Sequence, residues 1–145
     1  MQCQRCPTQT YVIYVNEDHK HLCERCTVGD ITRNFSRHEF ACKCGCGFDA
    51  IDERIVHRLQ VVRDIIQVKI DIHSGCRCKQ HNLDAKGKPL SFHLAQENGK
   101  AWAADWTVED EEKFIYAGRL LSNWSGGFHQ YSNFIHTDIG RKRRW

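Results

Sequence analysis

The sequence predicts an α+β fold, in which helices pack on a small antiparallel sheet and a zinc-ribbon hairpin precedes them. Apolar residues at steps of three and four predict one helix over 49–66 and another over 108–124. Short apolar or alternating runs, each bounded by turn residues, predict the strands. Cysteines in two C-x-x-C pairs predict the ribbon over 1–30, which leaves a second domain over 31–145.

The composition limits what the chain can be. Its 145 residues are 41% hydrophobic and 27% charged, which is enough apolar material for one core and unlike a disordered chain. No apolar run approaches the roughly 20 residues that span a bilayer, and the N-terminus lacks the pattern of a secretory signal. The net charge of +3 is too small to favour nucleic acid as a partner. We therefore expect a monomer that is made in the cytoplasm and binds neither membrane nor nucleic acid.

The N-terminal cysteines have the spacing of a structural zinc site. A β-type run over 11–15 and a turn separate the two pairs, which predicts a hairpin with one pair at each end. Four thiolates close the tetrahedral shell of a zinc ion and leave no position for a substrate. The ligands would be Cys3, Cys6, Cys23 and Cys26. Two disulfides or a redox-active pair are the alternatives, although no βαβ pattern surrounds either pair.

Periodicity and turn residues predict the remaining elements. The first helix carries one apolar stripe and leaves His57 outside it; the stripe consists of Ile51, Ile55, Leu59, Val62 and Ile66. Thr107 with Asp110 resembles the start of the second helix, which ends at 125–127. Strands are expected at 68–72, 101–106, 128–131 and 134–139. The basic tail 141–145 is expected to be a solvated end.

Three polar residues of the second domain suit a catalytic metal. Asp105 lies in one apolar strand, His136 lies in another, and His93 follows a Pro-Leu-Ser turn. Burying an ionisable group is costly unless it is paired or binds a metal. Two imidazoles and one carboxylate are a ligand set of catalytic zinc, with the fourth position open to water. Each residue taken alone would more often be a satisfied core residue.

Three segments of the second domain carry motifs of one family. S-G-C-R-C-K-Q-H-N spans 74–82, S-F-H and A-A-D span 91–93 and 103–105, and G-G-F-H-Q-Y-S-N-F-I-H-T-D-I-G spans 126–140. In this order they resemble the S-G-[YF]-R-S-x-x-H-N, S-x-H-x-x-G-x-A-x-D and G-G-x-x-x-Y…F-[VI]-H-x-D motifs of the zinc D-alanyl-D-alanine carboxypeptidases. The resemblance covers about residues 35–145, through the terminal R-R-W, and leaves the ribbon outside.

This resemblance implies that the second domain is catalytic. His93, Asp105 and His136 would hold one catalytic zinc, in addition to at least one structural zinc in the chain. The family cleaves peptides that contain D-amino acids, chiefly the stem peptides of bacterial peptidoglycan, and many members are bacteriophage lysis or tail enzymes, that is, endolysin-like. The chain is thus expected to act on the cell wall as a carboxypeptidase or endopeptidase, with zinc-activated water as the nucleophile. Arg77 would hold the oxyanion or a substrate carboxylate, and Ser91 would contact substrate.

The chain departs from the family pattern near these residues. Asp105 lies twelve residues after His93 where the family has seven, so that five residues within 94–102 are extra. Asn133 stands where some relatives place a carboxylate that serves as general base. Asp138 is then either the base or a partner that orients a zinc ligand. His81 and His129 are further candidate proton carriers.

Five further cysteines need a role, namely Cys42, Cys44, Cys46, Cys76 and Cys78. The last two stand where the family has an aromatic residue and a serine, on either side of Arg77. Together with the 42–46 group they would form another structural zinc site. Disulfides are the alternative for a protein that works outside the cell. A nucleophilic cysteine is least favoured, because spacing identifies no partner histidine.

A function of a different class stays open beside the peptidase. In this alternative the chain is an inactive, zinc-stabilised module that binds the cell wall, nucleic acid or a protein partner through the ribbon and the basic tail. The metal sites discriminate between the two functions. A mixed His/Asp/His site with an open position favours hydrolysis, whereas thiolate sites alone favour binding.

Overall fold

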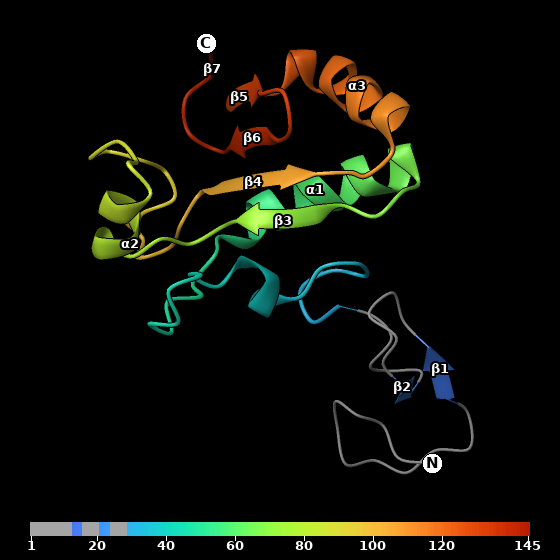
Figure 1. Cartoon of the computed structure of the whole chain (residues 1–145), viewed down its shortest axis with the longest axis horizontal. Helices are drawn as coiled ribbons and strands as arrows, with labels where there is room; N and C mark the ends of the chain where they lie inside the picture. Colours follow the sequence, from blue (N-terminus) through green and yellow to red (C-terminus); the bar gives the residue numbers. More distant parts are fainter. Residues whose placement is uncertain (1–12, 16–20, 24–28) are drawn as a thin grey trace.

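The computed structural model describes residues 13–15, 21–23 and 29–145 (Figure 1). Its elements in chain order are β1 (Ile13–Val15), β2 (His21–Cys23), the 3-10 turn η2 (Arg37–Phe40), α1 (Glu53–Ile66), β3 (Asp71–Ser74), α2 (Lys79–Asp84), β4 (Ala103–Thr107), α3 (Glu111–Leu120), the 3-10 turn η3 (Leu121–Asn123), β5 (Gly127–Gln130), β6 (Ile135–Asp138) and β7 (Arg143–Arg144). One main sheet with helices packed against it confirms the predicted α+β class.

The two N-terminal strands form an antiparallel pair, in which Ile13 lies opposite Cys23. Such a pair agrees with the hairpin that the sequence predicts between the two cysteine pairs. Cys3, Cys6 and Cys26 lie outside the described residues. The zinc ribbon and the domain boundary after residue 30 therefore stay predictions.

Five strands form the main sheet in the order β3-β4-β6-β5-β7. Neighbouring strands are antiparallel except β5 and β7, which are parallel, so the prediction of a purely antiparallel sheet is wrong at this edge. The exception comes from the basic tail, where Arg143 pairs with Gly127. The guanidinium of Arg144 also donates to the carbonyl oxygens of Gly126, at 2.8 Å, and Trp124, at 2.6 Å. Arg141, Lys142, Arg144 and Trp145 are exposed, as expected of a solvated tail, but these contacts fix the tail on the sheet edge and leave Arg143 half-buried.

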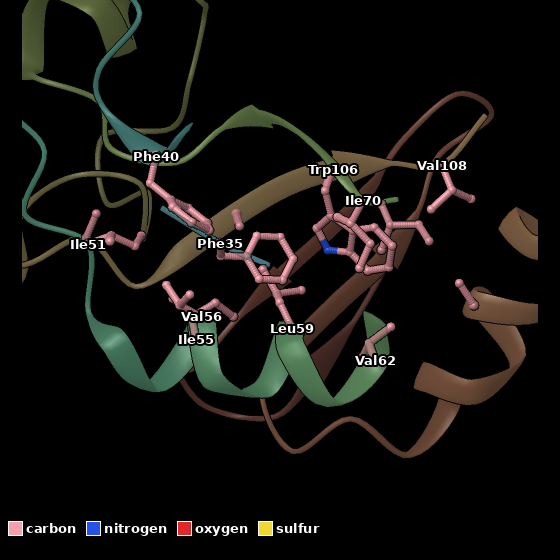
Figure 2. Packing of buried hydrophobic residues seen from close by; sticks show 14 of the residues in the cluster. Phe35, Phe40, Ile51, Ile55, Val56, Leu59, Val62, Ile70, Trp106 and Val108 are labelled. Atoms are coloured by element: carbon pink, nitrogen blue, oxygen red, sulfur yellow. The ribbon is translucent and has the colours of Figure 1, made fainter. Parts of the chain in front are cut away.

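The hydrophobic core lies between α1 and one face of the sheet (Figure 2). All members of the apolar stripe predicted for the first helix are buried, namely Ile51, Ile55, Leu59, Val62 and Ile66. On the sheet side, Ala104 and Trp106 of β4 and Ile135 of β6 belong to the same cluster. Successive side chains of a strand point to opposite faces. Asp105 lies between the two β4 positions and His136 follows Ile135, so both lie on the face turned away from α1.

Helix α1 begins at Glu53, four positions later than the sequence predicts, because Asp52 caps it. The Asp52 carboxylate accepts hydrogen bonds from the backbone N–H of Arg54, at 3.0 Å, and from the Arg54 guanidinium, at 2.8 Å. It also accepts from the Asn98 side chain, at 3.0 Å, which joins the loop before β4 to the start of the helix. The hydrogen bonds from Arg54 and Asn98 lower the pKa of Asp52 more than burial raises it, so the pKa falls to about 2.

Replacing Asp52 with alanine is expected to lower the free energy of unfolding by about 1–2 kcal/mol at neutral pH, as for other helix caps. The native-state pKa lies below the ordinary value of 3.8, so this contribution is present above pH 4 and is lost as the pH falls toward 2. Urea unfolding at pH 7 and pH 3 measures the difference. Asp84→Ala, at an exposed carboxylate, is the control. A difference between Asp52→Ala and wild type that is the same at both pH values would contradict the role of the charge.

The other elements shift from their predicted bounds for local reasons. Asp110, not Thr107, caps α3, since its carboxylate accepts from the backbone N–H of Lys113 at 2.9 Å while Thr107 still pairs with β3. The helix therefore starts three residues later than 108, and its last turn becomes η3. Strand β3 begins only at Asp71, after the apolar alternation of 68–70. Helix α2 is too short to show a period, and the sequence does not predict it.

Candidate active site

The register of β4 and β6 brings Asp105 directly opposite His136. Because opposite residues of an antiparallel pair share a face, both side chains project from the side of the sheet away from α1. Two residue pairs further, Ala103 lies opposite Asp138, which places Asp138 on the same face. Strand pairing alone therefore places two predicted zinc ligands, one from each strand, on the same face as the predicted general base.

His93 reaches this face from a turn that backbone hydrogen bonds hold in place. The N–H of Trp102 donates to the carbonyl of Phe92, and the N–H of Arg77 donates to the carbonyl of His93, both at 2.8 Å. The hydroxyl of Ser91 accepts from the N–H of His93 at 3.2 Å. The turn is thus tied to the residue before β4 and to the segment after β3, and His93 is 3% exposed.

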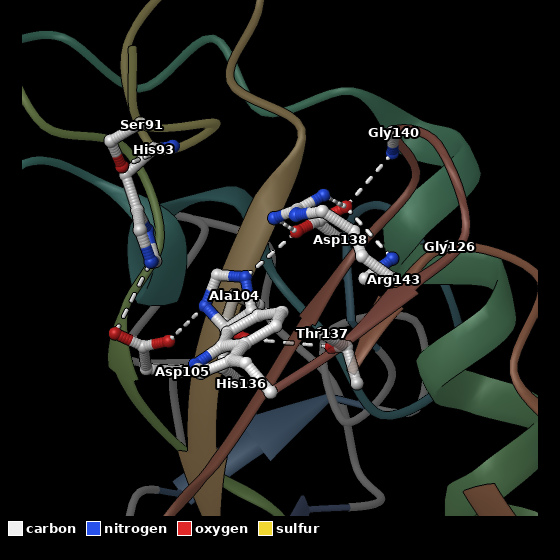
Figure 3. Close-up of polar contacts among 12 residues, drawn as sticks. Ser91, His93, Ala104, Asp105, Gly126, His136, Thr137, Asp138, Gly140 and Arg143 are labelled. Carbon is white, nitrogen blue, oxygen red and sulfur yellow. Dashed lines mark hydrogen bonds and ion pairs between the residues drawn. The ribbon is translucent and has the colours of Figure 1, made fainter. Parts of the chain in front are cut away.

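The three predicted zinc ligands converge (Figure 3). One donor atom from each of His93, Asp105 and His136 lies within 4.8 Å of the others. The Asp105 carboxylate is central, with Oδ1 at 2.7 Å from His136 Nδ1 and Oδ2 at 3.2 Å from His93 Nε2. Nitrogen and carboxylate oxygen donors in this number are those of a catalytic zinc site.

The protonation pattern of His93 indicates that a cation fits here. Its Nδ1 lies 2.7 Å from the carbonyl oxygen of Gly75, which can only accept, so Nδ1 carries the proton. In the neutral imidazole Nε2 then presents a lone pair, and this atom is buried without a hydrogen-bond partner among the described residues. It faces an Asp105 oxygen that also presents lone pairs. Two such atoms repel unless a positive charge lies between them, and the residues present therefore fit a divalent metal.

Asp138 contacts the other side of His136. Its Oδ2 lies 2.8 Å from His136 Nε2, the ring nitrogen that faces away from Asp105. Its Oδ1 accepts from the N–H groups of Gly127 and Gly140, each at 3.0 Å, and Arg143 binds both oxygens, at 2.7 and 3.2 Å. The side chain is fully buried. Of the two roles predicted for Asp138, this geometry favours orientation of a ligand histidine over general base catalysis.

Charges within the site keep both carboxylates ionised. Burial raises the pKa of Asp105, but the hydrogen bond with His136 and the proximity of the His93 ring outweigh it and hold the pKa well below its usual range. Burial likewise raises the pKa of Asp138, while His136 and Arg143 lower it to about 2. For His136, burial lowers the pKa, and the two carboxylates beside the ring raise it above the ordinary value. Both carboxylates are therefore ionised at neutral pH, as binding of a cation by Asp105 requires.

Arg77 also lies at the site, as the sequence predicts. Its guanidinium donates to Asp105 Oδ2 at 3.0 Å and to the hydroxyl of Ser74 at 3.0 Å. The side chain is 15% exposed, so it borders both the buried ligands and solvent. Ser91 supports the turn that carries His93. Whether these two residues contact substrate stays a prediction.

Four of the five remaining cysteines form a second group of donor atoms. The Sγ atoms of Cys42, Cys44, Cys46 and Cys78 lie within 4.8 Å of one another. Cys76 does not belong to this group; it is buried, and burial is the main reason that its pKa rises to about 12. The predicted set of five therefore separates into four clustered thiols and one neutral core thiol.

Sequence analysis missed two tail residues at the site. Arg143 anchors Asp138, and Trp145 lies against His136, with ring centroids 5.3 Å apart. Trp145 also stacks on His129, the residue of β5 opposite His136, at 5.4 Å. The terminal R-R-W motif is the one sequence feature that points to these two residues. Runs of charged residues are usually solvated, so the basic tail by itself does not predict a role at the site. His81, the other candidate proton carrier, lies in α2.

The extra residues between His93 and Asp105 form a loop that leaves the ligands in place. Gln96 closes the loop by accepting a backbone hydrogen bond from Gly99 at 2.8 Å, and Gly99 has a φ of +76°. Asn98 binds Asp52 and accepts from the indole N–H of Trp102 at 3.1 Å. The insertion is thus held at the start of α1, while Asp105 keeps its position in β4.

Comparison with family models agrees with this geometry. A model described as Peptidase M15 matches residues 33–138, which include all three converging ligands. The chain belongs to the peptidase M15 family. Peptidases of the M15 family are zinc-dependent, and at a general level the family indicates a metallopeptidase that acts on peptidoglycan. Comparisons of this M15 chain with curated proteins and with solved structures give no match. Within residues 29–145, none of the helices has the length and apolar character needed to cross a membrane.

Proposed function

We propose that the chain hydrolyses peptide bonds next to D-amino acids in the stem peptides of bacterial peptidoglycan. The observation that carries this proposal is the convergence of His93, Asp105 and His136, in which the buried Nε2 of His93 has no hydrogen-bond partner among the described residues. The M15 family supplies the general class of substrate, and the resemblance of the three motifs supplies the D-amino-acid preference. We also propose that the chain acts on the bacterial cell wall as a monomer.

Each residue of the site has a role in this reaction. His93, Asp105 and His136 would hold zinc, which when bound acts as a Lewis acid and activates water. Asp138 accepts a hydrogen bond from His136 Nε2–H and so fixes the ring with Nδ1 toward Asp105, free to serve as a zinc ligand. Arg77, at 3.0 Å from Asp105, places a guanidinium beside the reacting carbonyl and stabilises the charge that develops on its oxygen.

The mixed ligand set favours hydrolysis over the inactive binding module. A tetrathiolate site has no open coordination position, whereas two imidazoles and a carboxylate leave one for water. Arg77, partly exposed and paired with Asp105 beside the trio, is also placed where it could bind a carboxylate or a developing oxyanion.

Digestion of purified peptidoglycan by the full chain tests the proposal. We expect new amino groups and peptide fragments or free D-alanine to appear, to disappear after treatment with a chelator, and to return on addition of zinc but not magnesium. Release of D-alanine alone would identify a carboxypeptidase, and release of cross-linked peptides an endopeptidase. A zinc-loaded chain that binds peptidoglycan without releasing any product would overturn the proposal in favour of the binding module.

A further inference from the structure

The cluster of Cys42, Cys44, Cys46 and Cys78 lies outside the proposed catalytic site. Three of its members come from one loop, and the fourth precedes α2, more than thirty residues further along the chain. The burial of the four differs: Cys42 is buried, Cys44 and Cys46 are exposed, and Cys78 is intermediate. Hydrophobic packing therefore does not explain why the exposed thiols converge on the buried one.

The distances between the sulfur atoms match a shared ion. Cys44 Sγ lies 3.4 Å from Cys42 Sγ and 3.7 Å from Cys78 Sγ. Zinc binds thiolates at about 2.3 Å, so two sulfurs of one tetrahedron lie about 3.8 Å apart. A disulfide requires about 2.05 Å. The observed separations are thus close to the edges of a tetrathiolate site and far from those of a disulfide.

The backbone around the cluster has features that support thiolates. The N–H of Cys78 donates to Cys42 Sγ, and the N–H of His81 donates to Cys78 Sγ, both at 3.4 Å. Such bonds stabilise the negative charge that a ligating sulfur carries. Gly45 and Gly47 have φ values of +81° and +91°, which other residues rarely adopt. These turns let the alternate cysteines of 42–46 approach one point.

We propose that Cys42, Cys44, Cys46 and Cys78 bind a second, structural metal ion of the zinc class. The ion joins the loop 42–46 to the start of α2. It also anchors the backbone next to Arg77, whose other neighbour Cys76 is held by a hydrogen bond from its N–H to the carbonyl of Phe40, at 2.8 Å. The site has no open position and takes no part in the reaction of the proposed function.

Metal analysis of the full chain tests this site independently of activity. We expect Cys44→Ser/Cys46→Ser to contain one zinc fewer per chain than wild type, because both thiolates are lost. His93→Ala is the matched comparison, since it is expected to lose the catalytic ion and to keep the thiolate-bound one. Equal zinc content in wild type and Cys44→Ser/Cys46→Ser, or a disulfide among the four cysteines in chain purified without oxygen, would overturn the proposal.

A second measurement leaves the cluster itself unchanged. Cys23→Ser/Cys26→Ser removes two cysteines of the predicted N-terminal ribbon, so that cobalt bound to thiolates in this variant reports on the cluster. We expect the variant loaded with cobalt to show the intense sulfur-to-metal absorption of a tetrathiolate site. Absence of this absorption would overturn the proposal, even if the peptidoglycan assay succeeds.

Discussion

Replacement of His93 with alanine is expected to lower peptidoglycan hydrolysis by at least about 10³-fold. The variant removes one of three donors, and Asp105 and His136 alone are expected to bind the ion too weakly to retain it. A Lewis acid contributes several kcal/mol of transition-state stabilisation, and about 4 kcal/mol corresponds to this factor. Product release from purified peptidoglycan and zinc content per chain are the two measurements, and both should fall.

The control for this prediction is His57→Ala. His57 is exposed on α1 and belongs to neither metal group among the described residues, so its loss should change neither activity nor zinc content. Thermal unfolding of both variants shows whether they stay folded. Since His93 Nε2 has no hydrogen-bond partner, its removal leaves no new unsatisfied group there, and only Gly75 loses a bond. Equal product release by wild type and folded His93→Ala would reject the assignment of the ligand.

Much of this site was predictable because strand alternation and motif spacing are local properties. Asp105 and His136 are polar residues within apolar strands, so the penalty for burying them makes both candidates, and the motif resemblance then selects them as ligands before the strand register is known. The register then follows from the pattern, since a slip of one residue would turn Trp106 out of the core. The stripe of α1 was predictable for the same reason.

Other features depend on contacts between distant segments, which no local pattern reports. Arg143 reads as one charge in a basic tail, and only the parallel pairing of β7 with β5 brings it to Asp138. Which four of the five cysteines cluster also depends on such distant contacts. Cys76 and Cys78 flank Arg77 in the same way in the sequence, but only the Cys78 sulfur lies beside that of Cys44. The start of α1 was missed by four residues because two aspartates, 49 and 52, were available as caps.

Replacement of Asp138 with asparagine is expected to weaken zinc binding by about 10–100-fold, the usual cost of losing a partner that orients a ligand. An amide has one acceptor oxygen, so it cannot accept from Gly127 and Gly140 while also holding His136 and both contacts of Arg143. The His136 ring then loses its fixed orientation. Equilibrium titration with zinc and a competing chelator measures the affinity, with Asp84→Asn as the control at an exposed carboxylate.

The dependence of activity on zinc separates the two roles of Asp138. An orienting residue acts through metal occupancy, so saturating zinc should restore much of the activity of Asp138→Asn. A general base acts on the proton of the attacking water, so its loss would lower kcat at every zinc concentration and leave the zinc affinity unchanged. We expect the first result, because both oxygens of Asp138 are already occupied and the side chain is fully buried. The second result would restore Asp138 as the base and would require the hydrogen bonds around it to rearrange during the reaction.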